Sequence, residues 1–262
     1  MSRETAGPYR LLERTGEDRL GETWRARDTA RGRTGFVRVI HPDIAGDPEA
    51  RAALLSDARK ASAVSHPAVA SLFDVIDEND TIALAHEHVE GRTLAATLGG
   101  TPLNSRLAVA IAVQVADGLA DLHAAGITHG AVDASHVVIT PRGQAKLIDA
   151  GLVRWLSPST ETSDDIEAMG ALLASMTGRG LPTEQWSTDL RSVIDRTRAD
   201  HPRRYGSMPA LAADLRAVSA MLEARAEAAP PVTRGGGSGA SALLWALLAV
   251  ILLALGAWFL LM

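Results

Sequence analysis

Short alternations of apolar and polar residues in the N-terminal part of the chain predict β-strands. The first three are 9–14, 22–28 and 35–40, with turn signals at Thr15-Gly16 and Arg31-Gly32 between them. Two further apolar runs, 69–74 and 81–88, flank a predicted turn at 77–80. These segments predict a β-meander that grows into a small sheet.

The other predicted elements are helices. Apolar residues recur at helical spacing between 47 and 64, at Ala50, Leu54, Ala58 and Ala61. Asp47-Pro48 supplies an N-cap and a proline at the first helical position. After Gly91 the pattern predicts helices over 106–124, 166–176 and 210–224. An α+β fold class follows, in which a small β-rich lobe precedes a larger helical one.

The last 21 residues, 242–262, contain no charged side chain. At about 1.5 Å per residue, such a helix crosses a hydrocarbon core of about 30 Å. Trp245 and Trp258 suit the two membrane interfaces. A buried helix of a soluble domain would be shorter and carry a polar stripe, which this segment lacks. We therefore expect a C-terminal transmembrane helix over 242–262.

The segment 225–241 is predicted to be a flexible linker, because Pro230-Pro231 and a run of glycine and serine lie within it. Basic residues precede the predicted span and none follows it, namely Arg216, Arg225 and Arg234. This asymmetry places the N-terminal side in the cytoplasm. The N-terminus has no apolar signal segment. We expect a single-pass protein of the cell membrane with a cytoplasmic N-terminal domain.

The composition excludes several function classes. The chain has 26 basic and 31 acidic residues and a net charge of −5, so it lacks the broad positive charge that nucleic-acid binding needs. It has no cysteine, which excludes disulfides, thiolate nucleophiles and cysteine-bound metals. The only two lysines are Lys60 and Lys146. Nucleic acid is therefore not an expected partner.

Seven motifs follow one another in order between Tyr9 and Leu222. They are the glycine-containing stretch 16–28, Ser-His-Pro at 65–67, His-Glu-His-Val-Glu-Gly at 86–91, Leu-His-Ala-Ala-Gly-Ile-Thr-His at 122–129, Lys-Leu-Ile-Asp-Ala-Gly at 146–151, the stretch 165–178 and Arg-Tyr-Gly-Ser at 204–207. In this order they resemble a bacterial serine/threonine protein kinase domain of the actinobacterial type. The resemblance implies a two-lobed protein kinase fold with an N-lobe over 9–88 and a C-lobe over 89–224.

Arg38 stands where this family places the lysine that holds the ATP phosphates. Neither Lys60 nor Lys146 can be shifted into that position. Arginine keeps the charge, but its planar guanidinium is not an equivalent phosphate ligand. Asp57 aligns with the helix glutamate that pairs with the lysine. We expect an Arg38–Asp57 salt bridge with a structural role, with two unrelated surface charges as the alternative.

The loop 129–136 lacks the family's general base, because Ala131 occupies its position. Asp133 lies two residues further on, which on an extended segment is about 6–7 Å away. We expect a solvated or loop-capping aspartate there, with a displaced base as the alternative. His136 replaces the asparagine that binds the second magnesium ion, so that metal site is expected to be lost. No catalytic residue is therefore assigned.

The residual cofactor site has five candidate residues: Gly16, Gly21, Arg38, Asp57 and Asp149. Asp149 aligns with the metal-binding aspartate of the family and is the one candidate metal ligand. Asp18 replaces the middle glycine of the loop and puts a carboxylate where backbone amides should approach phosphate. The two glycines could equally belong to an ordinary β-turn. We expect no required cofactor, and at most weak binding of ATP and Mg²⁺.

The activation segment is truncated, because only 13 residues separate Gly151 from Asp165. The family places an acceptor platform and an Ala-Pro-Glu motif there, and neither fits, so Arg204 loses its usual glutamate partner. Without a platform, the positional contribution of about 7–11 kcal/mol to catalysis is lost. Thr160 and Thr162 are candidate phosphorylation sites, although turn and cap formation explains this hydroxyl-rich segment as well.

These departures predict a membrane-anchored pseudokinase that acts as a cytoplasmic docking or regulatory module without phosphotransfer. Anchoring would raise its effective concentration near membrane partners. The expected partners are the membrane, through one C-terminal span, and proteins that the sequence does not identify. The alternative is an atypical active serine/threonine kinase or a nucleotide-binding sensor, which retains Asp149 for the metal.

Overall fold

The computed structural model describes residues 4–78, 80–156, 164–177 and 185–228. Contacts divide the chain into two units, Met1–Glu223 and Ala224–Met262, and both lobes belong to the first. The predicted transmembrane helix at 242–262 lies outside the described residues, and so do Thr160 and Thr162. The predicted linker at 225–241 overlaps the last helix, which continues to Ala228, and its bounds stay a prediction.

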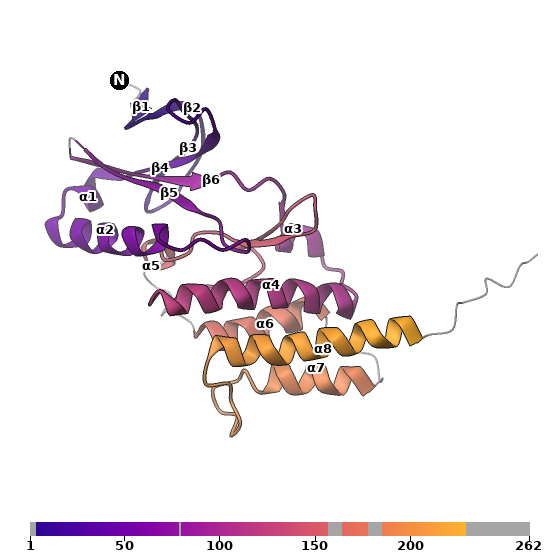
Figure 1. Ribbon diagram of the computed structural model, residues 1–262. Coiled ribbons are helices and arrows are strands. Elements are labelled where there is room, and N and C mark those ends of the chain that lie inside the picture. Colours follow the sequence, from indigo (N-terminus) through magenta and orange to yellow (C-terminus); the bar gives the residue numbers. More distant parts are fainter. Residues whose placement is uncertain (1–3, 79, 157–163, 178–184, 229–262) are drawn as a thin grey trace, which may run out of the picture. The chain divides into compact units, whose positions relative to one another are not determined.

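Six antiparallel strands form the sheet of the N-lobe, in the order β1-β2-β3-β4-β6-β5. They are β1 (Thr5–Ala6), β2 (Tyr9–Glu17), β3 (Gly21–Asp28), β4 (Thr34–Ile40), β5 (Leu72–Glu78) and β6 (Thr81–Glu87). The sheet occupies the upper part of Figure 1. The three predicted strands of the meander are thereby confirmed, and β6 matches the run at 81–88.

The predicted strand at 69–74 is displaced toward the C-terminus. In the structure β5 runs to Glu78, and Asp77 and Glu78 pair with Ile82 and Thr81 instead of forming a turn. The turn between β5 and β6 is therefore shorter than predicted. It contains Asp80, whose φ of 58° lies in the left-handed region that aspartate tolerates. The register with β6 decides where β5 lies, and that long-range pairing is not written in the local pattern.

Side chains alternate between the two faces of β4 and β6, as the period of two requires. Val37, Ala83 and Ala85 are buried with Tyr9 in a small cluster on one face. Ile40, Ile82 and Leu84 join the main core on the other face. The side chains of Phe36, Arg38 and His86 share this second face, because they keep the same parity along their strands.

The helix predicted at 47–64 is confirmed as α2 (Pro48–Ser62), which follows the single turn α1 (Pro42–Ala45). Asp47 caps α2, because its Oδ1 accepts hydrogen bonds from the backbone amides of Glu49 and Ala50, each at 2.9 Å. The buried face of α2 carries Leu54, Leu55, Ala58 and Ala61. It packs against β5.

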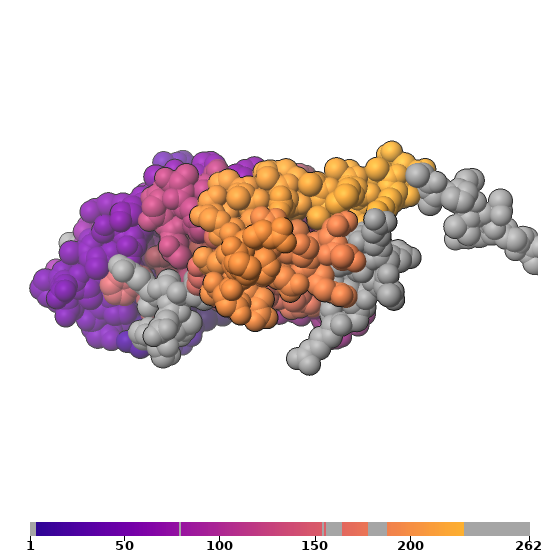
Figure 2. Space-filling view, turned by 90° about the horizontal axis from the view of Figure 1, so that it is seen from below, coloured from indigo at the N-terminus to yellow at the C-terminus, as the bar shows by residue number. Residues whose placement is uncertain are grey.

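The C-lobe is mainly helical. Its helices are α3 (Leu94–Leu98), α4 (Ser105–Ala124), α5 (Val153–Leu156), α6 (Asp165–Thr177), α7 (Gln185–Asp195) and α8 (Met208–Ala228). A small sheet of β7 (Arg92–Thr93), β8 (Val137–Ile139) and β9 (Ala145–Leu147) completes it, in the order β7-β8-β9. The three predicted helices of this region are confirmed as α4, α6 and α8, whereas α3, α5 and α7 were not predicted. In Figure 2 the orange and yellow atoms of α7 and α8 form much of the surface seen from below.

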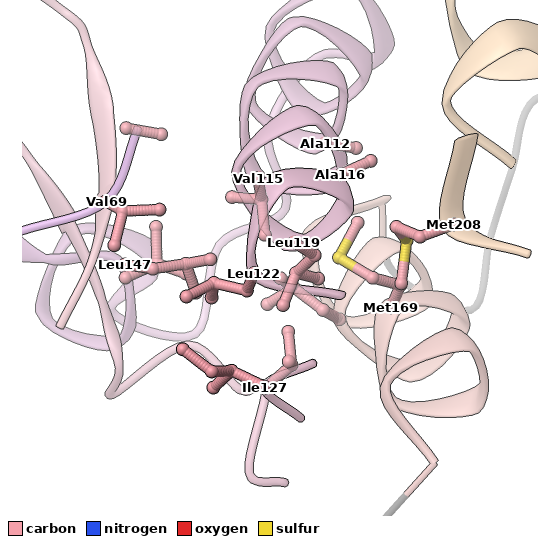
Figure 3. Packing of buried hydrophobic residues seen from close by; sticks show 14 of the residues in the cluster. Val69, Ala112, Val115, Ala116, Leu119, Leu122, Ile127, Leu147, Met169 and Met208 are labelled. Atoms are coloured by element: carbon pink, nitrogen blue, oxygen red, sulfur yellow. The ribbon is translucent and has the colours of Figure 1, made fainter. Parts of the chain in front are cut away.

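Helix α4 is the centre of the main core. Val115, Leu119 and Leu122 on α4 are fully buried. Figure 3 shows Val69 and Leu147 on one side of α4, and Met169 of α6 with Met208 of α8 on the other. Among the described residues, α4 alone is long and apolar enough to cross a membrane, and 50% of its apolar window is buried in the protein. Its position among the packed elements is that of a core helix.

Candidate functional site

The guanidinium group of Arg38 lies between two carboxylates. Its Nη2 is 3.0 Å from Asp18 Oδ2, and its Nη1 is 3.4 Å from Asp149 Oδ1. The Arg38 side chain is only 11% exposed, so water screens these contacts weakly. Asp18 belongs to the turn after β2 and Asp149 to the turn after β9. We call Asp18, Arg38 and Asp149 the cleft triad.

Asp18 also closes its own turn. Its Oδ1 accepts hydrogen bonds from the backbone amides of Leu20 at 2.9 Å and Gly21 at 3.2 Å. In a phosphate-binding loop, backbone amides of this kind point at the bound anion. Here a carboxylate of the chain already occupies them, as the sequence suggested when Asp18 was found at the middle glycine position.

The predicted Arg38–Asp57 salt bridge is wrong, because Arg38 pairs with Asp18 and Asp149. The two residues are unrelated, as the alternative stated, but Arg38 is buried and is not a surface charge. Asp57 Oδ2 accepts a hydrogen bond of 3.0 Å from Trp155 Nε1, and Trp155 lies on α5. Arg38 instead uses the two carboxylates of the cleft triad. The sequence pattern could not predict this, because Asp18 and Asp149 are close to Arg38 only in the folded chain.

The two candidate glycines differ in what they do. Gly21 pairs with Ile40 where β3 approaches β4, and a Cβ atom on Gly21 would lie 2.0 Å from the backbone oxygen of Val39. Gly16 is exposed in β2, and a Cβ atom there would meet nothing within 4 Å. Gly21 is therefore required by the backbone packing, whereas Gly16 is not.

The loop that carries Ala131 keeps a rigid frame. The carboxylate of Asp165, which is buried at the start of α6, accepts hydrogen bonds from the backbone amides of His129 at 2.9 Å and Gly130 at 2.8 Å. His123 Nε2 lies 2.7 Å from the same carboxylate. His129 Nε2 donates to the backbone oxygen of Ile148 at 3.0 Å, which joins this loop to the turn of Asp149.

Asp133 is a loop cap, as the sequence predicted. Its Oδ1 accepts hydrogen bonds from the backbone amides of Ser135 at 2.7 Å and His136 at 3.1 Å, and His136 Nδ1 lies 3.0 Å away. Partial burial would raise the pKa of Asp133, but the hydrogen bonds from Ser135 and the neighbouring His136 hold that pKa below its usual range. A carboxylate with this low proton affinity is a poor general base.

Arg204 has a partner that sequence analysis missed. It forms an ion pair with Asp164, the residue before α6. Asp164 also accepts a hydrogen bond of 2.9 Å from the backbone amide of Ile166, so it caps that helix. Burial acts to raise the pKa of Asp164, but the hydrogen bonds from Arg204 and Ile166 and the charge of Arg204 together outweigh burial and lower the pKa. The acidic pair Asp164-Asp165 was the available signal.

A cavity of about 210 Å³ lies beside the cleft triad. Its lining combines apolar walls with a few polar groups, and includes Thr23, Phe36, Arg38, His86, Val138 and Asp149. Phe36 pairs directly with His86 across β4 and β6, and its ring packs edge to face on His88 with centroids 4.8 Å apart. Phe36 and Arg38 share a strand face, so the sequence contained a signal that a bulky ring faces the cleft.

His86 is the unusual polar group of this cavity. Its Nε2 atom is buried and has no hydrogen-bond partner among the described residues. Burial and the nearby positive charge of Arg38 lower the pKa of His86 to about 4, while Asp149 acts in the opposite direction. His86 is therefore neutral at pH 7. It belongs to the motif at 86–91 but was not singled out by the sequence.

The structure brings three of the five candidate residues together, namely Gly21, Arg38 and Asp149. Gly16 and Asp57 lie elsewhere, in the outer part of β2 and beside Trp155. Within the described ranges, no group of three or more histidine, aspartate or glutamate side chains could hold a metal ion. The assignment of Asp149 to a metal stays a prediction. Its φ of 60° places it in a left-handed turn before α5.

Comparisons with known proteins agree with this architecture. The sequence model of the protein kinase domain matches residues 9–178. Serine/threonine-protein kinase PknA of Mycobacterium tuberculosis is 32% identical over 165 residues, which cover 60% of this chain and 38% of PknA. The kinase pkn2 of Myxococcus xanthus is 31% identical over 172 residues, which cover 64% of this chain and 20% of that protein. The chain thus spans well under half of either relative.

The crystal structure of the PknI kinase domain of Mycobacterium tuberculosis is similar in fold. It superposes with a TM-score of 0.65 at 20% sequence identity, and the match covers 84% of this chain and 99% of that domain. The predicted two-lobed protein kinase fold, with a β-rich N-lobe and a helical C-lobe, is confirmed.

The difference between the two glycines is testable by substitution. We expect Gly21→Ala to lower the free energy of unfolding by about 1–3 kcal/mol, because the new methyl group overlaps the Val39 carbonyl. Gly16→Ala is the matched control and should stay within about 0.5 kcal/mol of the wild type. Urea denaturation followed by circular dichroism measures both. Equal losses in the two variants would contradict the assignment.

Burial of neutral His86 should make stability depend on pH. The folded protein binds this proton with a pKa of about 4 and the unfolded chain with a pKa of 6.5, so stability falls as the pH drops between these values. His86→Leu removes this proton, and we expect it to gain up to about 3 kcal/mol relative to wild type at pH 4. His88→Leu, an exposed neighbour, is the control. Parallel stability curves for the wild type and His86→Leu would refute this.

Proposed function

Because this chain belongs to the protein kinase domain family, we propose that it is a pseudokinase, which docks or regulates protein partners without transferring phosphate. The cleft triad is the observation that carries this proposal.

The charge of the cleft triad opposes phosphate binding. One guanidinium group faces two carboxylates, so the three groups together carry a net negative charge. A triphosphate would have to displace Asp18 from Arg38 and from the amides of Leu20 and Gly21. The weakly screened repulsion between phosphate and carboxylate disfavours this exchange. A metal at Asp149 would offset part of the repulsion, but Asp18 would remain at the phosphate position.

The proton acceptor is also missing. Ala131 has no group that can accept a proton, and Asp133 is held in its loop by Ser135 and His136. The frame built on Asp165 is nevertheless retained. A loop that keeps its hydrogen-bonded frame but has no proton acceptor supports a function in binding partners, which depends on the shape of the domain.

The segment after Gly151 supports the same function. It contains 13 residues before Asp165, and its first part forms the short helix α5. Trp155 on α5 is bound to Asp57 on α2, so this segment contacts the N-lobe. Such a contact suits a fixed docking surface. A platform for an acceptor hydroxyl would need a longer chain than this one provides.

We further propose that residues 242–262 anchor the chain in the cell membrane, with the kinase-like domain in the cytoplasm. Support comes from the charge-free apolar segment and the arginines before it. The anchor would concentrate the domain near membrane-associated protein partners.

The second candidate is an atypical active kinase or a nucleotide sensor. It is favoured by the relatives, which are named serine/threonine-protein kinases, and by the retention of Asp149. In that case Arg38 would serve as the phosphate ligand after moving away from Asp18.

Nucleotide assays on the full chain in detergent micelles separate the two candidates. We expect no thermal shift with millimolar ATP and Mg²⁺, and no transfer of labelled γ-phosphate to the chain itself or to myelin basic protein. Asp18→Gly removes the carboxylate at the phosphate position and should strengthen ATP binding on the order of tenfold or more. Glu17→Ala, which changes the exposed last residue of β2 next to Asp18, should not.

Two outcomes would count against the pseudokinase. Label transfer by the wild type that Asp149→Ala abolishes would establish the active kinase. A thermal shift by ATP without label transfer, also lost in Asp149→Ala, would establish the nucleotide sensor.

The membrane anchor is tested by fractionation of cells that express the protein. We expect the full chain to remain in the membrane pellet after a high-salt wash and after alkaline carbonate, because only detergent displaces a spanning helix. A chain ending at residue 228 should move to the soluble fraction. Release of the full chain by salt would show that the segment 242–262 does not span the bilayer.

A further inference from the structure

Helix α8 has one buried and one exposed face. Leu211, Leu215 and Val218 on the buried face belong to the main core. In Figure 2 the helix lies along the surface of the protein, in orange and yellow. The exposed side chains recur at intervals of three and four positions, so they lie together on the opposite side of the helix. We call this the outer face; it contains Ala210, Ala213, Ala217 and Ala220.

A large apolar side chain borders the outer face. Met221 is 38% exposed and is one of three large apolar side chains that are exposed among the described residues. Intervals of three and four residues separate the contact positions of paired helices. Alanine at these positions lets two helix axes approach to the short end of the usual range of about 8–10 Å. The outer face is thus suited to pack against another helix.

Charged residues flank the outer face in a self-complementary order. Arg216 and Glu223 lie on one flank, and the midpoint between them falls just before Ala220. Asp214 and Arg225 lie on the other flank and, by their spacing along the helix, have the same midpoint. Each flank therefore carries one basic and one acidic residue, placed symmetrically about a single point.

Two copies of α8 that pair antiparallel about this point bring opposite charges together on both flanks. Arg216 of one copy then lies opposite Glu223 of the second copy, and a two-fold axis produces the same contact twice. A parallel pair would bring neither charge pair together. The symmetry favours a second copy of this chain over an unrelated protein, because an unrelated partner would not require a shared midpoint.

The charges on the two flanks are accessible for contacts with a second copy. The side chain of Arg216 is 55% exposed, although its Nη2 forms an ion pair with Asp117 of α4. The side chain of Asp214 is 42% exposed and pairs with Arg196 through Oδ2. A guanidinium group has five N–H donors and a carboxylate has several acceptor positions. Both groups can therefore keep their present partners and form a second contact.

We propose that two copies of this chain associate through the outer faces of α8, antiparallel and about a two-fold axis next to Ala220. The inference rests on the proposed membrane anchor. Burial of a methyl group contributes only about 0.8 kcal/mol, so two alanine faces associate weakly in dilute solution. The proposed anchor begins at Ala242, shortly after α8 ends at Ala228. Two chains in one membrane have a raised effective concentration, at which a weak interface is sufficient.

Because the chain contains no cysteine, disulfide cross-linking gives a direct test. Ala220→Cys and, as the matched control, Ala210→Cys are introduced separately into the full chain, and isolated membranes are oxidised with copper phenanthroline. Next to the two-fold axis the two sulfurs at position 220 come within bonding distance. At position 210 they are about 28 Å apart along the helices. We expect a covalent dimer of Ala220→Cys and a monomer of Ala210→Cys on a denaturing gel.

Charge variants in the Ala220→Cys chain test the register. Arg216→Glu should lower the cross-linked fraction about threefold or more, since two like-charge contacts replace two ion pairs in each dimer. Adding Glu223→Arg restores opposite charges and should recover the cross-linked fraction. Asp117→Ala removes the partner of Arg216 within the chain but leaves the contact between copies, so it should not lower the fraction.

The proposal is overturned if Ala220→Cys stays monomeric in membranes, or if Ala210→Cys cross-links equally well, as in a parallel pair or in random collisions. It is also overturned if Glu223→Arg does not restore the cross-linking lost in Arg216→Glu. Absence of the chain from the membrane fraction would reject the proposed anchor. The oxidation is then repeated with the concentrated full chain in solution, where a monomeric Ala220→Cys would overturn the pairing separately. ATP binding and label transfer test the pseudokinase alone, so the failures are distinguishable.

Discussion

The contact of Arg38 with Asp18 and Asp149 joins the two lobes, because Arg38 lies on β4 and Asp149 on the turn after β9. An ion pair between fully exposed side chains contributes little to the free energy of folding. Here the guanidinium group is largely buried, and loss of one carboxylate would leave a buried charge without full compensation. The same contact that holds the cleft together also occupies the groups that would meet a phosphate. The contact that joins the lobes is therefore also the contact on which the proposed loss of phosphate binding rests.

The C-lobe keeps an ordered frame around the loop 129–136, in which position 131 is alanine. Asp165 fixes the loop by accepting hydrogen bonds from the backbone amides of His129 and Gly130. The preceding residue, Asp164, forms an ion pair with Arg204. Both carboxylates are structural because they satisfy buried or helix-terminal donors. None of this depends on a base at position 131. The loop geometry is therefore a poor guide to catalysis, and the identity of the side chains has to be read separately.

Local patterns predicted the longer strands and helices of the fold, with the exception of α7. The meander, α2 with its Asp47 cap, and the core helix α4 follow from periodicity and capping. The position of β5 did not, because its pairing with β6 sets the register. The prediction of an Arg38–Asp57 salt bridge was wrong for a related reason. Asp57 came to lie beside Trp155, and the placement of α5 against α2 is decided by packing between segments far apart in the sequence.

The sequence by itself determined which groups are missing, since no arrangement of the chain can turn Ala131 into a base or supply a third lysine. It also determined the alternation that puts Phe36 and Arg38 on one strand face. Only the tertiary structure decided what the remaining charges do. Ion pairs and cavities depend on distances between residues separated by many positions, and Arg38 meets Asp149 across 111 of them. Such distances arise from packing of the whole domain, which no local pattern encodes.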